Sequence, residues 1–218
     1  MKELSEQQKL LHAYEQKLAE ATSATEKIKY TLFIENIKNP VEEKLESLNE
    51  ENAVLSFRHT FLSNFYSVPI QYQGRTWPSV EHAYQAQKFD EEILNEVTPS
   101  QKQELNEILK ERGSAYQIAD MQAIWSDPNM TSGNIKVVAD KLRDWGFVRT
   151  DWDDFKIELM IELLQQKFYH PDLEAQLKAT GDKYLLEGNT WNDTFWGAAD
   201  GRGKNFLGRI LMWVRDGG

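Results

Sequence analysis

The stretch TWPSVEHAYQAQKF, residues 76–89, combines the character of a helix with an acid, a hydroxyl, an amide and an amine. Ser79 is a candidate N-cap, and Glu81 falls in the first turn, where a helix favours a hydroxyl cap and a carboxylate. We therefore expect a helix that begins after Ser79 and continues to about residue 89.

On such a helix, Glu81 and Lys88 lie within about 20° of each other around the axis and about 10.5 Å apart along it. Tyr84 and Gln85 fall between them on the same face. One interpretation is a solvated helix face, with the carboxylate near the N-terminus and the amine near the C-terminus. The other is a ligand-binding face that offers an acid, a hydroxyl, an amide and an amine.

Two further blocks contain polar residues that packing alone does not explain. In FLSNFY, residues 61–66, Asn64 sits between aromatic residues in an expected loop. It either caps a turn or hydrogen-bonds a ligand. In NDTFWGAADGRGKNFLG, residues 192–208, four glycines surround Arg202 and Lys204 just before an expected helix. This block is an ordinary loop or a phosphate seat built from backbone N–H groups and two cations.

Composition excludes several classes of function. The chain has no cysteine, four histidines and a formal charge of −10. The histidines are not spaced as metal ligands, and thiolate ligands and disulfides are excluded, so we expect no metal and no cofactor. The net negative charge disfavours binding along many phosphates of a nucleic-acid backbone. The N-terminus lacks an apolar signal region, and no run of apolar residues is long enough to span a membrane. We therefore expect a cytoplasmic protein.

The first 51 residues differ from the rest, because they contain neither glycine nor tryptophan. Their spacing predicts two amphipathic helices and a short third helix near residues 42–49. This extension is either an arm folded onto the main domain or an element for self-association or partner binding. A third interpretation makes the arm the functional part and the enzyme domain a toxin or defence component.

The remaining chain is expected to be mainly α with a small β element, an α+β fold. Turn and cap residues divide it into short elements. The expected strands are 54–59, 70–72 and 184–186, and the expected helices are 79–89, 99–112, 114–125, 132–145, 153–168, 172–179 and 205–215.

These motifs, in this order, resemble the NADAR family, the YbiA-like N-glycosidases. The matching stretches are FLSNF, TWPSVEHAYQAQKF and WNDTFWGAADGRGKNFLGRILMWVR, with a middle helix that carries Trp152, Lys156 and Lys167. The resemblance implies a NADAR domain at residues 52–217 after a helical extension at 1–51. It also implies hydrolysis of N-ribosyl bonds, in ribosylamino-pyrimidine phosphates of riboflavin synthesis or in ADP-ribose attached to guanine, including guanine of nucleic acid.

The resemblance assigns the catalytic role to Glu81 and Lys88. Ala198 and Ala199 depart from the loop of the family, which is often more polar or richer in glycine at this place. The expected substrate-binding residues are Asn64, Trp77, Tyr84, Gln85, Asp193, Trp196, Gly197, Arg202, Lys204 and Asn205.

Two mechanisms fit the catalytic pair. A neutral Lys88 can attack C1′ of the opened sugar and form an imine while Glu81 shuttles protons, which is the favoured interpretation. Alternatively, Glu81 activates a water molecule directly. A third possibility is a binding module for ADP-ribose or NAD without turnover.

Overall fold

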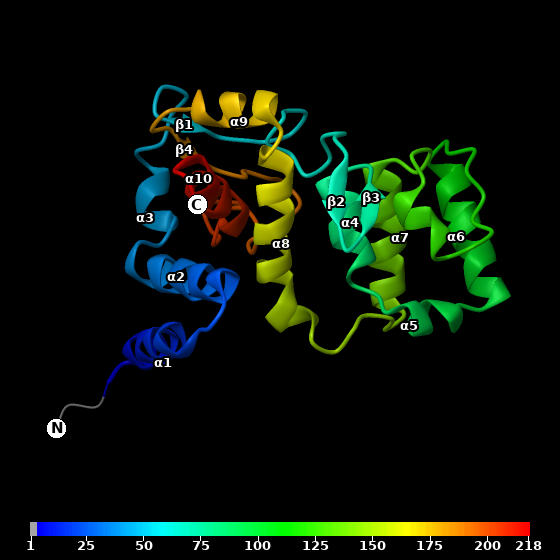
Figure 1. The fold of residues 1–218 in the computed structure, drawn as a ribbon, viewed down its shortest axis with the longest axis horizontal. Coiled ribbons are helices and arrows are strands. Elements are labelled where there is room, and N and C mark those ends of the chain that lie inside the picture. Colours follow the sequence, from blue (N-terminus) through cyan, green and yellow to red (C-terminus); the bar gives the residue numbers. More distant parts are fainter. Residues whose placement is uncertain (1–3) are drawn as a thin grey trace. The chain divides into compact units, whose positions relative to one another are not determined.

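The computed structural model describes residues 4–218 and shows a mainly helical chain with short strands. The expected fold class, mainly α with a small β element, is confirmed. The chain divides into two compact units, which are described separately (Figure 1). The first unit holds the described residues up to Leu62 and those from Met160 onward, and the second holds residues 63–159. The expected extension therefore belongs to the same unit as the C-terminal part of the chain.

Two capped helices open the first unit. Ser5 Oγ accepts the N–H of Gln8, and Gln8 Oε1 accepts the N–H of Ser5. Ser23 and Glu26 form the same reciprocal pair. Such capping boxes satisfy N–H groups that the helix itself leaves without partners. The helices of this segment are α1 (Glu6–Glu20), α2 (Ala24–Lys38) and α3 (Glu42–Leu45).

The arm packs on the C-terminal helix of its own unit. Tyr14 of α1 stacks on Phe33 of α2 with ring centroids 4.6 Å apart. Phe33 in turn meets the edge of Phe206, the first residue of α10, at 5.2 Å. This packing agrees with the first interpretation of the extension, an arm folded onto the domain. Self-association or partner binding by the arm stays a prediction.

The rest of the first unit surrounds α10. The apolar residues of α10 recur at helical spacing and are buried, so this helix is the centre of the unit's core. It packs against β4, α9 and α2, and β4 pairs in parallel with β1 (Figure 1). The elements are β1 (Ala53–Val54), α9 (Pro171–Lys178), β4 (Tyr184–Leu185) and α10 (Phe206–Arg215).

The second unit is built around α4, whose residues are all buried. This helix packs against α7 and the antiparallel hairpin of β2 and β3 (Figure 1), and against η1. The turn of the hairpin places Gln73 and Gly74 at positive φ. The long helix α8 begins in this unit. The elements are β2 (Ile70–Tyr72), β3 (Arg75–Trp77), α4 (Val80–Ala86), α5 (Glu91–Asn95), α6 (Pro99–Glu111), η1 (Ala123–Ser126), α7 (Ser132–Asp144) and α8 (Trp152–Phe168).

The helix expected at 114–125 is wrong: only the short 3₁₀ turn η1 forms there. The segment before it follows an irregular path because Asn106 of α6 bonds the backbone of Ile118 through both ends of its amide, at 2.7 and 3.5 Å. Two residues before Ile118, the hydroxyl of Tyr116 donates to Asp127 at 2.9 Å and fixes the same segment. Side-chain bonds here replace the helical ladder.

Two other boundaries also differ from expectation. The strand expected at 54–59 is limited to β1, since the N–H of Phe57 donates to Glu187 Oε2 instead of a neighbouring strand. Helix α4 ends at Ala86 and not at residue 89, because the N–H groups of Lys88 and Phe89 bond the carbonyls three residues back and tighten the chain. No helix in residues 4–218 is long and apolar enough to cross a lipid bilayer.

Candidate functional site

Buried side-chain hydrogen bonds fix the N-terminus of α4. Ser79 Oγ caps the helix by accepting the N–H of His82 and also lies 2.8 Å from His82 Nδ1. His82 Nε2 lies 2.7 Å from the carbonyl of Met130, and burial lowers the pKa of this histidine. Trp77, just before the helix, is buried and donates its Nε1–H to the carbonyl of Tyr72. These hydrogen bonds fix the first turn of the helix that carries Glu81.

Glu81 is a buried carboxyl, 5% exposed. Its N–H donates to the carbonyl of Asn64 at 3.0 Å, and its Oε1 accepts from Gln85 Nε2 at 2.7 Å. Burial raises the pKa of Glu81. The Gln85 hydrogen bond and the positive charges of Lys136 and Lys88 oppose that rise. Glu81 is thus a carboxyl that can hold a proton more readily than a solvated one.

Lys88 lies beyond the end of α4, so the expected single helical face for Glu81 and Lys88 is wrong. The chain nevertheless keeps the two groups electrostatically coupled. Lys88 Nζ lies 5.3 Å from the ring centre of Tyr84 and 5.6 Å from that of Trp152, and these two rings pack edge to face. Burial lowers the pKa of Lys88 to about 8, against a rise caused by Glu81. At pH 7, about a tenth of such an amine is neutral.

Helix α7 adds charged groups that the sequence did not single out. Lys136 pairs with Asp140 at 3.2 Å, and Arg143 also reaches Asp140 at 2.8 Å. Lys136 lowers the pKa of both Glu81 and Lys88, and Asp140 raises both. The i, i+4 spacing of Lys136 and Asp140 was visible in the sequence, but only the packing of α7 on α4 brings the pair to this cluster.

The glycine-rich loop of the first unit, residues 192–208, is organised by one carboxylate and one amide. Asp193 Oδ1 accepts the N–H groups of Phe195 and Trp196. Asn205 is fully buried at positive φ, accepts the N–H of Glu187 and donates to the carbonyl of Leu185. Both side chains are engaged by the backbone, so the geometry gives them a scaffolding role, and direct substrate contact by either stays a prediction.

Close backbone approach explains one glycine, and two cations stay at the surface. A Cβ on Gly197 would strike the carbonyl of Glu187. Arg202 and Lys204 are exposed, and Lys204 Nζ lies 5.3 Å from the ring centre of Phe195. An anion that binds this loop can therefore meet two cationic side chains.

The expected site residues fall into two groups, one in each unit. The second unit holds Asn64, Trp77, Glu81, Tyr84, Gln85 and Lys88, and the structure connects most of them through α4. The first unit holds Asp193, Trp196, Gly197, Arg202, Lys204 and Asn205.

Two ionisable groups of the first unit, the half-buried Glu187 and the fully buried Lys167, have shifted pKa values that the sequence did not predict. Burial raises the pKa of Glu187, whose Oε2 accepts the N–H of Phe57, to about 7. Lys167 is fully buried in α8, and burial lowers its pKa to about 7. Lys167 lies in the middle helix that carries the family resemblance, but the shifts in pKa depend on tertiary packing and have no local signal.

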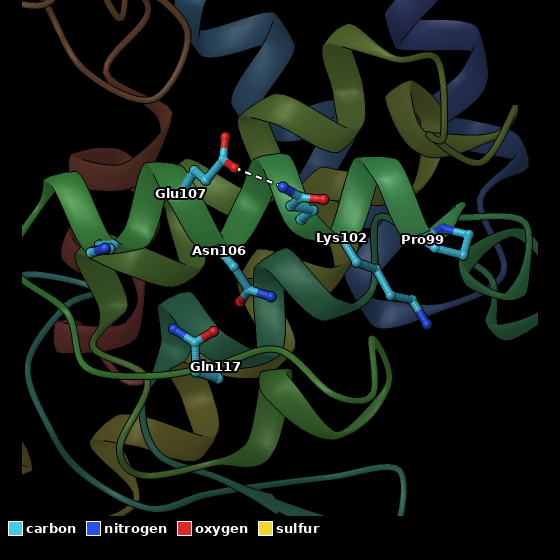
Figure 2. A pocket seen from close by; sticks show the side chains of 7 residues that line it. Pro99, Lys102, Asn106, Glu107 and Gln117 are labelled. Carbon is cyan, nitrogen blue, oxygen red and sulfur yellow. Dashed lines mark hydrogen bonds between the residues drawn. The ribbon is translucent and has the colours of Figure 1, made fainter.

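A surface hollow of about 400 Å³ lies along α6, away from these residues in the chain (Figure 2). Its lining includes Asn106 and Gln117, but Asn106 already bonds the backbone of Ile118, and Gln103 bonds Glu107. This hollow therefore offers few uncommitted polar groups. Residues 4–218 contain no group of three or more histidine and acidic side chains placed to hold a metal ion.

The helical fold and the motifs on α4 and before α10 define a NADAR domain, which matches residues 50–217. The chain belongs to the NADAR family. It is 34% identical over 157 residues to the N-glycosidase YbiA of Escherichia coli, which covers 71% of this chain and 78% of that protein. The NMR structure of E. coli YbiA superposes with a TM-score of 0.51 at 29% identity, over 77% of this chain and 88% of that one.

A second kind of relative is larger. A riboflavin biosynthesis protein of Vibrio vulnificus is 36% identical over 160 residues, which is 72% of this chain and 35% of that protein. The chain thus spans about a third of that relative. The relatives named N-glycosidase, which the chain matches over most of its length, identify the chain as an enzyme of N-glycosidase type.

Proposed function

We propose that the chain hydrolyses the bond between C1′ of a ribose and an amino nitrogen in a small phosphorylated ribosylamine, such as a ribosylamino-pyrimidine phosphate. The names of the relatives, N-glycosidase and riboflavin biosynthesis protein, support this class. ADP-ribose attached to guanine is the second candidate substrate. The charge of −10 favours the small substrate, because many phosphates of a polynucleotide would be repelled.

In the proposed reaction, Lys88 is the nucleophile and Glu81 the proton carrier. The neutral amine bonds to C1′ of the ring-opened sugar, the bond from C1′ to the leaving nitrogen breaks, and Glu81 gives that nitrogen its proton. Water then adds to the imine carbon, Lys88 leaves as an amine, and free ribose phosphate is released. No cofactor takes part in this sequence.

The observation that carries the proposal is the pairing of a buried carboxyl with a buried amine in one cluster. Burial raises the pKa of Glu81 and lowers the pKa of Lys88, so each group moves toward the form the reaction needs. The rings of Tyr84 and Trp152 lie next to the amine of Lys88, and Gln85 donates a hydrogen bond to the carboxyl of Glu81. A salt-bridged pair at the surface would instead keep the amine charged.

A direct assay tests the substrate. The protein is incubated separately with a ribosylamino-pyrimidine phosphate and with DNA that carries ADP-ribosylated guanosine, and release of the free amine or base is measured by chromatography. We expect turnover of the small phosphate at a rate well above that of the DNA. Release from the DNA alone would replace the small substrate by ADP-ribosylated guanine, and release from neither would reject the proposed activity.

The two surface cations of the glycine-rich loop are proposed to bind a phosphate of the substrate. Arg202→Ala removes a charged hydrogen bond of about 1.5–3 kcal/mol, which corresponds to a rise in KM of roughly ten- to hundredfold. We expect that rise for the phosphorylated substrate and little change for its dephosphorylated form. Steady-state kinetics on both substrates measures the difference.

The matched control is Lys178→Ala, which removes an exposed cation of α9 that pairs with Glu174. This variant should leave KM unchanged for both substrates. An equal effect of Arg202→Ala on the phosphorylated and dephosphorylated forms would show that the loop does not recognise phosphate.

A further inference from the structure

The backbone N–H groups that lead into α10 are almost all committed within the loop itself. A phosphate seat of the usual kind needs such groups to be available at a helix start. Between residues 202 and 207, every backbone N–H except that of Gly203 donates to a backbone carbonyl of the same loop. The pairs are Arg202 to Ala199, Lys204 to Thr194, Asn205 to Gly197, Phe206 to Phe195 and Leu207 to Trp196.

Gly203 is the exception, because its N–H donates to a side chain. The acceptor is Glu42 Oε1, at 3.0 Å. Gly203 has a φ of 150°, and a Cβ there would strike the backbone of Gly197 and Ala198. Glu42 lies 161 positions earlier in the chain, outside the NADAR match at residues 50–217. The arm thus supplies a carboxylate to the central loop of the domain.

Contacts on both sides of Glu42 hold it in place. Val41 is fully buried against Leu186 and Ala198. Lys44 Nζ lies 5.1 Å from the ring centre of Tyr184. An apolar contact and a cation–π contact therefore hold the segment 39–45 against the C-terminal part of the same unit.

One arginine also ties the arm to the loop directly. Arg209 of α10 donates from Nη2 to the carbonyl of Asn39 at 2.7 Å and from Nε to the carbonyl of Lys204 at 3.0 Å. Its guanidinium thus bridges the residue that follows α2 and the loop residue that follows Gly203. Glu42 and Arg209 together fix the backbone between Arg202 and Lys204.

We propose that Glu42 is a positioning residue for substrate binding. By holding the N–H of Gly203, it keeps the loop in the conformation that presents Arg202 and Lys204 to a phosphate. The inference rests on the phosphate-binding role proposed for the loop. It assigns the N-terminal arm a part in substrate affinity, although the arm lies outside the family domain.

The test compares Glu42→Ala, Glu42→Gln and the matched control Glu43→Ala, which removes a charge one position further along α3. The glutamine keeps an acceptor oxygen at the same place, so it should rescue what the alanine loses. For the phosphorylated substrate we expect KM to rise about tenfold in Glu42→Ala, with kcat unchanged. Glu42→Gln and Glu43→Ala should stay near the wild type.

Two measurements without turnover keep this test independent of the proposed activity. Amide hydrogen exchange by NMR should show loss of protection at Gly203 in Glu42→Ala and retention in Glu42→Gln. Calorimetric binding of ribose 5-phosphate should weaken about tenfold in Glu42→Ala alone. Tighter binding of ribose 5-phosphate in both Glu42 variants would overturn the inference, because the carboxylate would then compete with phosphate. Equal behaviour of Glu42→Ala and Glu43→Ala would overturn it as well.

Discussion

Glu81→Gln is expected to lower kcat by at least about a hundredfold, the scale for loss of a general acid or base. Gln at this position can still accept the hydrogen bond from Gln85 Nε2, so α4 should keep its structure. What is lost is the ability to carry a proton in a site where burial raises the pKa of the carboxyl. Single-turnover and steady-state rates on the ribosylamino-pyrimidine phosphate measure the loss.

The Glu81 variant has a second expected signature. Because the charge of Glu81 raises the pKa of Lys88, its removal should lower that pKa further. Any residual activity should therefore reach its plateau at a lower pH than in the wild type. Glu104→Gln is the matched control, since Glu104 pairs with Lys141 in the same unit. A Glu81→Gln enzyme that turns over like this control would remove Glu81 from the mechanism.

Lys88→Ala and Lys88→Arg are both expected to lose at least about a hundredfold in kcat, since neither side chain can form the imine. In the wild type, the attacking form is the neutral amine, and its pKa is about 8. The value of kcat/KM should thus rise as the pH passes through about 8, the pKa of Lys88, and level off at higher pH. That rising limb should be absent from the residual activity of either variant.

Lys141→Ala provides the control for this pair. Lys141 Nζ also lies over an aromatic ring, 5.2 Å from the centre of Trp145, and it forms a salt bridge with Glu104. Its removal should leave both kcat and the pH profile intact. An active Lys88→Arg enzyme with an unchanged pH profile would favour water activated by Glu81 as the mechanism.

Much of the fold follows from local signals. Ser79 marks the start of α4 and Pro99 that of α6, because a hydroxyl cap and an N-terminal proline act within a single turn. The helix α10 was also predicted, at residues 205–215. These signals need no knowledge of the distant parts of the chain.

The features that the sequence did not predict depend on tertiary contacts. The expected helix at 114–125 is replaced by irregular chain because Asn106 of α6 bonds Ile118. The catalytic role of Glu81 and Lys88 stays a prediction. That the charged pair Lys136 and Asp140 acts on both groups depends on the packing of α7 on α4, which no local pattern shows. No local pattern could have paired Glu42 with Gly203.

The most direct test of the central proposal is reductive trapping during turnover. Cyanoborohydride is added to the enzyme with the ribosylamino-pyrimidine phosphate, and the digested protein is analysed by mass spectrometry. Lys167 serves as the internal comparison, because burial also lowers the pKa of its amine, to about 7. We predict a ribose phosphate adduct, reduced to a secondary amine, on the peptide that contains Lys88 and none on the peptide that contains Lys167. Turnover without any adduct on Lys88, or an adduct on Lys167 instead, would contradict the account.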